Sequence, residues 1–166
     1  MAFSTTRIIL QVASSALFAA AAIAQPSPCA SHILPSQTWS TDSGSVFRIQ
    51  LPPGLTRRPV RPVDSEVGLW EGEGSELSYD FGAYSSPLRD SARTSGKVCD
   101  TTIGGRPARV VIYRDDRGRY AFGAHWDGFT ARRRAAVSLT IMGFARDSIA
   151  RDSLVASIWS LTFRGR

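Results

Sequence analysis

Short segments in which apolar and polar residues alternate recur along this 166-residue chain, and tight-turn residues separate them. In the segment 76–81 every second residue is apolar, which is the pattern of a strand with one buried face. Gly104-Gly105 follows another such segment and is a strong signal for a two-residue hairpin turn. Hairpin connections imply that neighbouring strands pair antiparallel. The expected strands are 46–51, 67–70, 76–81, 97–103, 108–113, 120–126 and 136–144.

Near the C-terminus the spacing of the apolar residues changes from that of a strand to that of a helix. Asp147 or Ser148 can cap this helix, because a short side-chain oxygen accepts hydrogen bonds from the free N–H groups of the first turn. The expected apolar stripe consists of Ile149, Leu154, Ile158 and Leu161. We therefore predict an α+β fold, with a mostly antiparallel sheet of about six to seven short strands and a C-terminal helix packed on one face.

Residues 1–24 have the three parts of a cleavable secretory signal peptide. Arg7 supplies a positive charge, residues 8–23 carry no charge, and Ala22 and Ala24 place small residues at the cleavage positions. The alternative is an uncleaved membrane anchor, but the apolar run is short for a span of roughly 20 residues. We expect a secreted or periplasmic protein without a transmembrane segment in the mature chain.

The rest of the chain divides into two parts by composition. Residues 25–44 are rich in Pro, Ser and Thr and have little hydrophobic pattern, so we expect a flexible N-terminal lead. Residues 45–166 suit a single α+β domain with one core.

The expected mature chain has two cysteines, Cys29 and Cys99. In an oxidising compartment such a pair is most simply one disulfide bond, which would tie the lead to the middle of the domain. The alternatives are two free thiols or a metal site, although two thiols without a nearby pair of histidines make a poor zinc site.

The formal net charge of +6 mildly favours anionic partners, but the basic residues do not form the dense stripe of a nucleic-acid-binding protein. Arginines in two expected loops are the best candidates for binding an anion, because guanidinium groups match phosphate and carboxylate geometry. These candidates are Arg57, Arg58, Arg132, Arg133 and Arg134. The alternative is that these charges solubilise the chain and protect a sheet edge.

His125 and Asp127 invite a catalytic interpretation, because alternation along a strand places them on the same face. The chain has no nucleophile elbow, phosphate-binding loop, dinucleotide motif or CxxC pair. The carboxylates within 64–80 lack the spacing of a calcium-binding loop. We therefore predict no catalytic residue, no metal and no cofactor, and keep a small secreted hydrolase that uses His125 as an alternative.

Three segments, FRIQLPPG (47–54), IGGRPA (103–108) and IWSLTF (158–163), together resemble the PsbP-like sandwich family of small α/β/α domains. The resemblance covers residues 45–166, and none of its motifs is catalytic. It implies a sheet flanked by helices and a binding or scaffolding role. The expected function is that of an exported accessory domain whose partner is an unknown protein or an anionic ligand. A module that binds anions or charged surfaces through the arginine loops is a further alternative.

Overall fold

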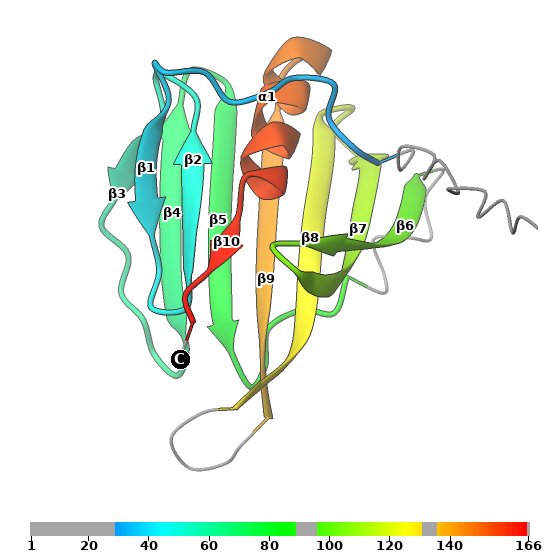
Figure 1. The fold of residues 1–166 in the computed structure, drawn as a ribbon. Helices are drawn as coiled ribbons and strands as arrows, with labels where there is room; N and C mark the ends of the chain where they lie inside the picture. The colour runs from blue at the N-terminus through cyan, green and yellow to red at the C-terminus, as the bar shows by residue number, and fades with distance from the viewer. Residues whose placement is uncertain (1–28, 89–95, 131–135, 166) are drawn as a thin grey trace, which may run out of the picture.

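The computed structural model describes residues 29–88, 96–130 and 136–165, so the expected signal peptide lies outside the described residues. The described residues form β1 (Ser40–Ser43), β2 (Phe47–Leu51), β3 (Thr56–Arg58), β4 (Glu66–Gly72), β5 (Ser75–Gly82), β6 (Lys97–Ile103), β7 (Arg106–Arg114), β8 (Tyr120–Thr130), β9 (Ala136–Ala145), α1 (Ser148–Trp159) and β10 (Thr162–Phe163). Seven strands form one antiparallel sheet in the order β3-β4-β5-β9-β8-β7-β6, and three form a second in the order β1-β2-β10 (Figure 1). Within the described ranges, no helix is long and apolar enough to cross a bilayer.

The expected α+β class is wrong, because the described residues form a mostly β structure of two antiparallel sheets with one helix. Each of the seven expected strands is present, but β1, β3 and β10 were not expected. These three strands are two to four residues long, so they are too short to carry an alternating pattern. Pairing with a neighbouring backbone makes them strands, and that pairing leaves no local signal in the sequence.

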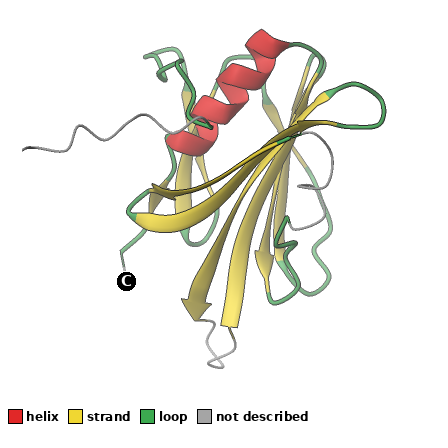
Figure 2. Ribbon diagram, turned by 90° about the vertical axis from the view of Figure 1, so that its right-hand side faces the viewer, coloured by secondary structure: helices red, strands yellow, loops and turns green. Residues whose placement is uncertain are grey.

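One face of the seven-stranded sheet is covered by α1 and by the three-stranded sheet (Figures 1 and 2). The helix begins after Asp147, whose carboxylate accepts a hydrogen bond from the Ala150 N–H at 2.8 Å. This bond holds the pKa of the Asp147 carboxyl below its usual value. Leu154 and Ile158 are buried as expected, whereas Ile149 is 75% exposed, so the buried stripe begins later in the helix than the sequence indicated.

A cluster of aromatic residues and one carboxylate joins the two sheets. Phe47 of β2 packs edge-on against Tyr79 of β5, with 5.0 Å between the ring centroids. Trp70 of β4 lies 5.5 Å from the same tyrosine ring. Its indole N–H donates to Asp42 Oδ2 in β1 at 2.6 Å. Because Asp42 and Trp70 belong to different sheets, this hydrogen bond helps to fix the three-stranded sheet on the larger one.

The stability of the protein is expected to fall between pH 10 and about pH 12 because of Tyr79. Burial, a hydrogen bond to Glu66 and the charge of Glu66 raise the pKa of Tyr79 from 10.0 to about 12. The folded protein therefore keeps a phenol proton that the unfolded chain has lost. This contribution is complete below pH 10 and is lost as the pH rises through the folded pKa, by about 2 kcal/mol once solvent screening is allowed for.

Urea denaturation across this pH range measures that loss, and Tyr79→Phe is the matched variant. The variant should lose less stability than the parent over the same interval. Equal slopes for the two proteins would contradict the assignment to Tyr79.

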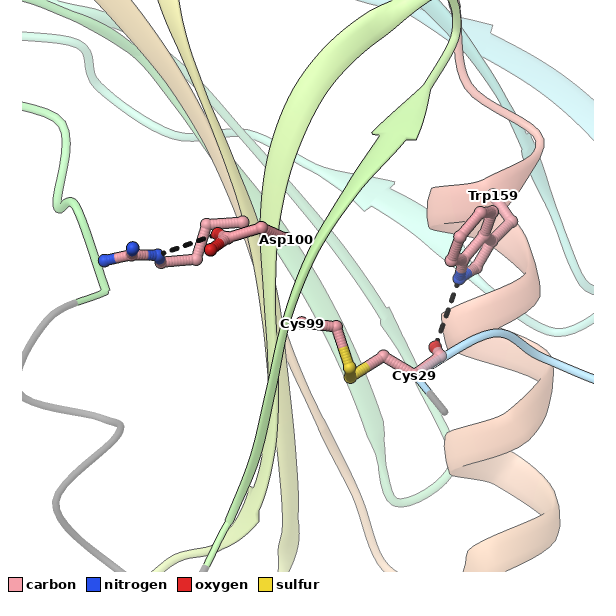
Figure 3. Close-up of a disulfide and its surroundings, with 5 residues drawn as sticks. Cys29, Cys99, Asp100 and Trp159 are labelled. Atoms are coloured by element: carbon pink, nitrogen blue, oxygen red, sulfur yellow. Dashed lines mark hydrogen bonds and ion pairs between the residues drawn. A yellow bond between two sulfur atoms is a disulfide. The ribbon is translucent and has the colours of Figure 1, made fainter. Parts of the chain in front are cut away.

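The expected disulfide between Cys29 and Cys99 is present, with Cα atoms 6.1 Å apart, and the described residues contain no free cysteine. The Trp159 indole N–H of α1 donates to the Cys29 carbonyl at 3.2 Å (Figure 3). The Ser31 hydroxyl donates to the Asp152 carbonyl of the same helix at 2.9 Å. Residues 29–32, within the expected flexible lead, therefore connect α1 to β6, and we call this segment the strap.

Candidate functional site

A cavity of about 480 Å³ opens where α1, the β6–β7 hairpin and the strap meet, and we call it the helix–sheet pocket. Lys97 at the start of β6, Arg114 at the end of β7 and Arg151 near the start of α1 line this cavity. Two strands and the helix therefore each contribute one cationic side chain to the same space.

Strand pairing explains why the two hairpin residues face the same cavity. Lys97 lies directly opposite Ile112, and Arg114 points to the same face as Ile112 because the two are two residues apart in one strand. Arg114 is in turn opposite Tyr120, the first residue of β8. The twisted sheet thus presents two cations and an aromatic ring toward α1.

The guanidinium groups of Arg114 and Arg151 are both held against the ring of Tyr120. Their Cζ atoms lie 3.9 Å and 4.8 Å from the ring centroid, which is within the range of cation–π attraction. Arg114 also donates from Nη1 to the Gly118 carbonyl at 2.8 Å, and Arg151 donates from Nε to Asp152 Oδ1 at 2.8 Å. These contacts hold both cations in position before any ligand arrives.

The described lining of the pocket carries more positive than negative charge. The lining contains three cationic side chains, which are Lys97, Arg114 and Arg151, and one carboxylate, which is Asp152. Asp152 forms an ion pair with Arg151. The ammonium group of Lys97 makes no ion pair within the described part of the chain. Positive charge in a concave site attracts and concentrates anions.

The strap forms one wall of the pocket. Ala30 and His32 line the cavity, and they follow directly after the cysteine that is bonded to Cys99. Figure 3 shows the disulfide crossing the space between β6 and the strap beside α1. The disulfide therefore fixes this pocket wall to β6, and the hydrogen bonds from Trp159 and Ser31 fix it to α1.

A second cavity, of about 490 Å³, contains His125 and Asp127. It includes residues of the opposite face of the large sheet, where Asp100 points away from the side of β6 that carries Cys99 (Figure 3). Asp100, Arg109 and His125 are successive cross-strand partners in β6, β7 and β8. Arg109 Nε donates to Asp100 Oδ1 at 3.3 Å, so this cavity has mixed charge.

Hydrogen bonds engage both ring nitrogens of His125. Nδ1 lies 2.8 Å from the Thr140 hydroxyl, and Nε2 lies 3.0 Å from Asp127 Oδ1, which confirms that His125 and Asp127 share a face. The Thr140 hydroxyl donates to the Ser86 carbonyl at 2.6 Å. The Ser138 hydroxyl donates to Asp127 Oδ1 at 2.8 Å.

Thr140, His125 and Asp127 have the hydroxyl–imidazole–carboxylate order of a hydrolytic triad, but the environment does not suit catalysis. Thr140 is 3% exposed, and its hydroxyl donates a hydrogen bond to a backbone carbonyl. His125 is 6% exposed, and the neighbouring Ser138 bonds to the carboxylate instead of to the ring. The network is therefore suited to joining β8 and β9 rather than to activating a nucleophile.

Two of the arginines expected to bind anions, Arg57 and Arg58, are among the described residues and lie outside the helix–sheet pocket. Arg57 and Arg58 are adjacent in β3 and point to opposite faces of the sheet. Arg57 Nη1 donates to Asp42 Oδ1 at 3.0 Å, and Arg58 Nε donates to Glu71 Oε2 at 3.0 Å. Neither residue lines the helix–sheet pocket. Arg132, Arg133 and Arg134 lie outside the described residues, so anion binding by these loops stays a prediction.

Sequence reasoning missed the helix–sheet pocket, although part of its signal was present. The Gly104-Gly105 turn predicts a hairpin whose far ends carry Lys97 and Arg114, so these two cations were predictable neighbours. Arg151 belongs to a helix whose placement on the sheet has no local signature. The pocket exists only because α1 and the strap close over the hairpin.

Two further observations limit how the site can be interpreted. Among the described side chains, no group of three His, Cys, Asp or Glu residues is arranged to hold a metal ion. A scan against protein-family models matched none of them, and a search of curated proteins found no similar sequence. The interpretation of the pocket therefore rests on its own chemistry.

Proposed function

We propose that this chain is an exported, non-catalytic binding domain that takes an anionic ligand in the helix–sheet pocket. The observation that carries the proposal is the convergence of Lys97, Arg114 and Arg151 on one cavity that has a single described carboxylate. Guanidinium and ammonium groups bind carboxylate, sulfate and phosphate groups through charge-assisted hydrogen bonds. Side chains that are fixed before binding lose less entropy when the ligand arrives.

Several observations support binding in preference to chemistry. The described lining of the helix–sheet pocket has no nucleophile paired with a base, and the Thr140 hydroxyl beside His125 is closed off from solvent. The sequence resemblance to the PsbP-like sandwich family also implies a binding or scaffolding role, but the described residues form two antiparallel sheets with one helix instead of the sheet flanked by helices that it implies. The disulfide is consistent with a site of action outside the cytoplasm.

Titration with sodium sulfate, followed by amide chemical shifts in NMR spectra, tests this proposal. We expect saturable shifts at residues 97, 114 and 151, and an affinity that falls as sodium chloride is added, because salt screens the attraction. The double variant Lys97→Gln, Arg151→Gln should bind sulfate about tenfold more weakly, since each lost pairing between partly exposed charges contributes on the order of 0.2–1 kcal/mol.

Arg48→Gln is the matched control, because Arg48 is exposed on β2 and does not line the pocket. This variant loses one positive charge but should keep the sulfate affinity of the parent protein. Unchanged sulfate affinity in the double variant, or shifts that map away from the pocket, would overturn the proposal.

A further inference from the structure

We infer that the ligand of the helix–sheet pocket is a free amphiphilic anion, in which one carboxylate, sulfonate or phosphate group is attached to an apolar body. This inference rests on the proposed function and adds the chemical class of the ligand. Its basis is the composition of the pocket walls, which combine cationic and apolar side chains in one cavity.

The apolar part of the lining comes from three elements of the core. Val155 of α1 is buried, and Ile112 of β7 and Tyr120 of β8 are half-buried and pack against the core cluster. Arg151 and Val155 are four residues apart, so they share one face of the helix and point toward the same cavity. Binding becomes more favourable when an apolar group of the ligand replaces water against apolar walls.

The cations and the apolar walls differ in their exposure, and this difference orients the ligand. Lys97 and Arg114 are exposed, Arg151 is half-buried, and Val155 is buried. The positive charge therefore lies toward the mouth of the cavity, and the apolar surface lies toward its floor. A ligand that matches this gradient places its anionic group at the rim and its apolar body inside.

The size of the cavity also favours an organic ligand over an inorganic ion. About 480 Å³ falls within the range of roughly 300–1,000 Å³ that is usual for small-molecule sites. A sulfate or phosphate ion bound by the cations would leave most of this space filled with water. An aromatic or alicyclic body would displace that water from Ile112 and from the exposed part of Tyr120.

Three probes separate the two parts of the inference. The probe 8-anilinonaphthalene-1-sulfonate carries an anionic group on an aromatic body and fluoresces when bound. N-phenyl-1-naphthylamine has the same type of body without the charge, and sulfate is the anionic group alone. We expect the aromatic sulfonate to bind at one site per chain, at least about tenfold more tightly than either of the other probes.

Substitutions of pocket residues test whether the aromatic sulfonate binds in the pocket. Lys97→Gln with Arg151→Gln should weaken the aromatic sulfonate about tenfold, whereas the control Arg48→Gln should not change its affinity. Ile112→Thr should weaken the aromatic sulfonate severalfold more than it weakens sulfate. If Ile112→Thr fails to fold by circular dichroism, the comparison of the three probes on the parent protein still decides the question.

Three results would contradict the inference, and the last of them would also contradict the proposed function. If sulfate binds as tightly as the aromatic sulfonate, the apolar body contributes nothing, and the inference fails while the proposed function stands. If the neutral amine binds as tightly, the charge is irrelevant, and the inference fails. If neither anion responds to the loss of Lys97 and Arg151, both the inference and the proposed function fail.

Discussion

Replacing Cys29 and Cys99 together by serine is expected to lower the free energy of unfolding by about 4 kcal/mol. The bonded cysteines are separated by 70 residues, so the disulfide closes a long loop and removes much of the freedom of the unfolded chain. Urea denaturation of the oxidised protein, the reduced protein and the double variant measures the effect. The reduced protein and the double variant should show similar losses, because both lack the same covalent link.

The same substitution should also weaken ligand binding. Ala30 and His32 of the strap line the helix–sheet pocket, and without the disulfide the strap is held to α1 mainly by hydrogen bonds. Ser31→Ala is the control, since it keeps the disulfide and removes only the hydrogen bonds of the Ser31 hydroxyl to the Asp152 carbonyl and from the Ile33 N–H, which should cost about 1–2 kcal/mol. A double variant as stable as the oxidised protein would show that the disulfide does not constrain the unfolded chain as argued.

Trp70→Ala is expected to destabilise the protein by about 3–5 kcal/mol, because it removes the largest side chain at the junction of the two sheets. Trp70 is 1% exposed and contacts the ring of Tyr79. The change also removes the indole N–H that donates to Asp42, which leaves that carboxylate paired with the exposed Arg57 among the described residues. Thermal and urea unfolding both measure the loss.

Trp70→Phe separates packing from hydrogen bonding at this position. Phenylalanine keeps part of the buried apolar surface but has no donor for Asp42, so we expect a loss of about 1–3 kcal/mol, smaller than that of the alanine variant. Val63→Ala is a neutral reference, because Val63 is 96% exposed. If Trp70→Ala costs no more than the Val63→Ala reference, the junction described here does not hold the two sheets together.

Much of the local structure was predictable from sequence. The hairpin around Gly104-Gly105, the alternating strand β5 and the capped helix after Asp147 each depend on residues that are close together in the chain. The disulfide was predictable because an oxidising compartment leaves few other roles for two cysteines. The class of the fold was not predictable, since β1, β3 and β10 are too short to carry an alternating pattern, and β10 pairs with β2, a strand far from it in sequence.

Long-range packing also changed the role of particular side chains. Arg57 had the sequence context of a free loop cation, but the pairing of β3 with β4 brings it over Trp70 and next to Asp42. His125 and Asp127 are close because of strand alternation, which the sequence contains. The hydrogen bond from the Thr140 hydroxyl to the Ser86 carbonyl joins residues that are 54 positions apart in the chain, so no local pattern predicts it.

By itself, then, the sequence determined the turns, the alternating strands, the helix and its cap, and the cysteine pair, because short-range sterics and the two hydrophobic periods act within a few residues. Only the tertiary structure decided that Lys97, Arg114 and Arg151 meet around Tyr120. That meeting requires α1 to pack on the sheet and the strap to be fixed to β6. Both depend on buried contacts between segments that are distant in the chain. The free energy of such contacts cannot be predicted from a local sequence pattern.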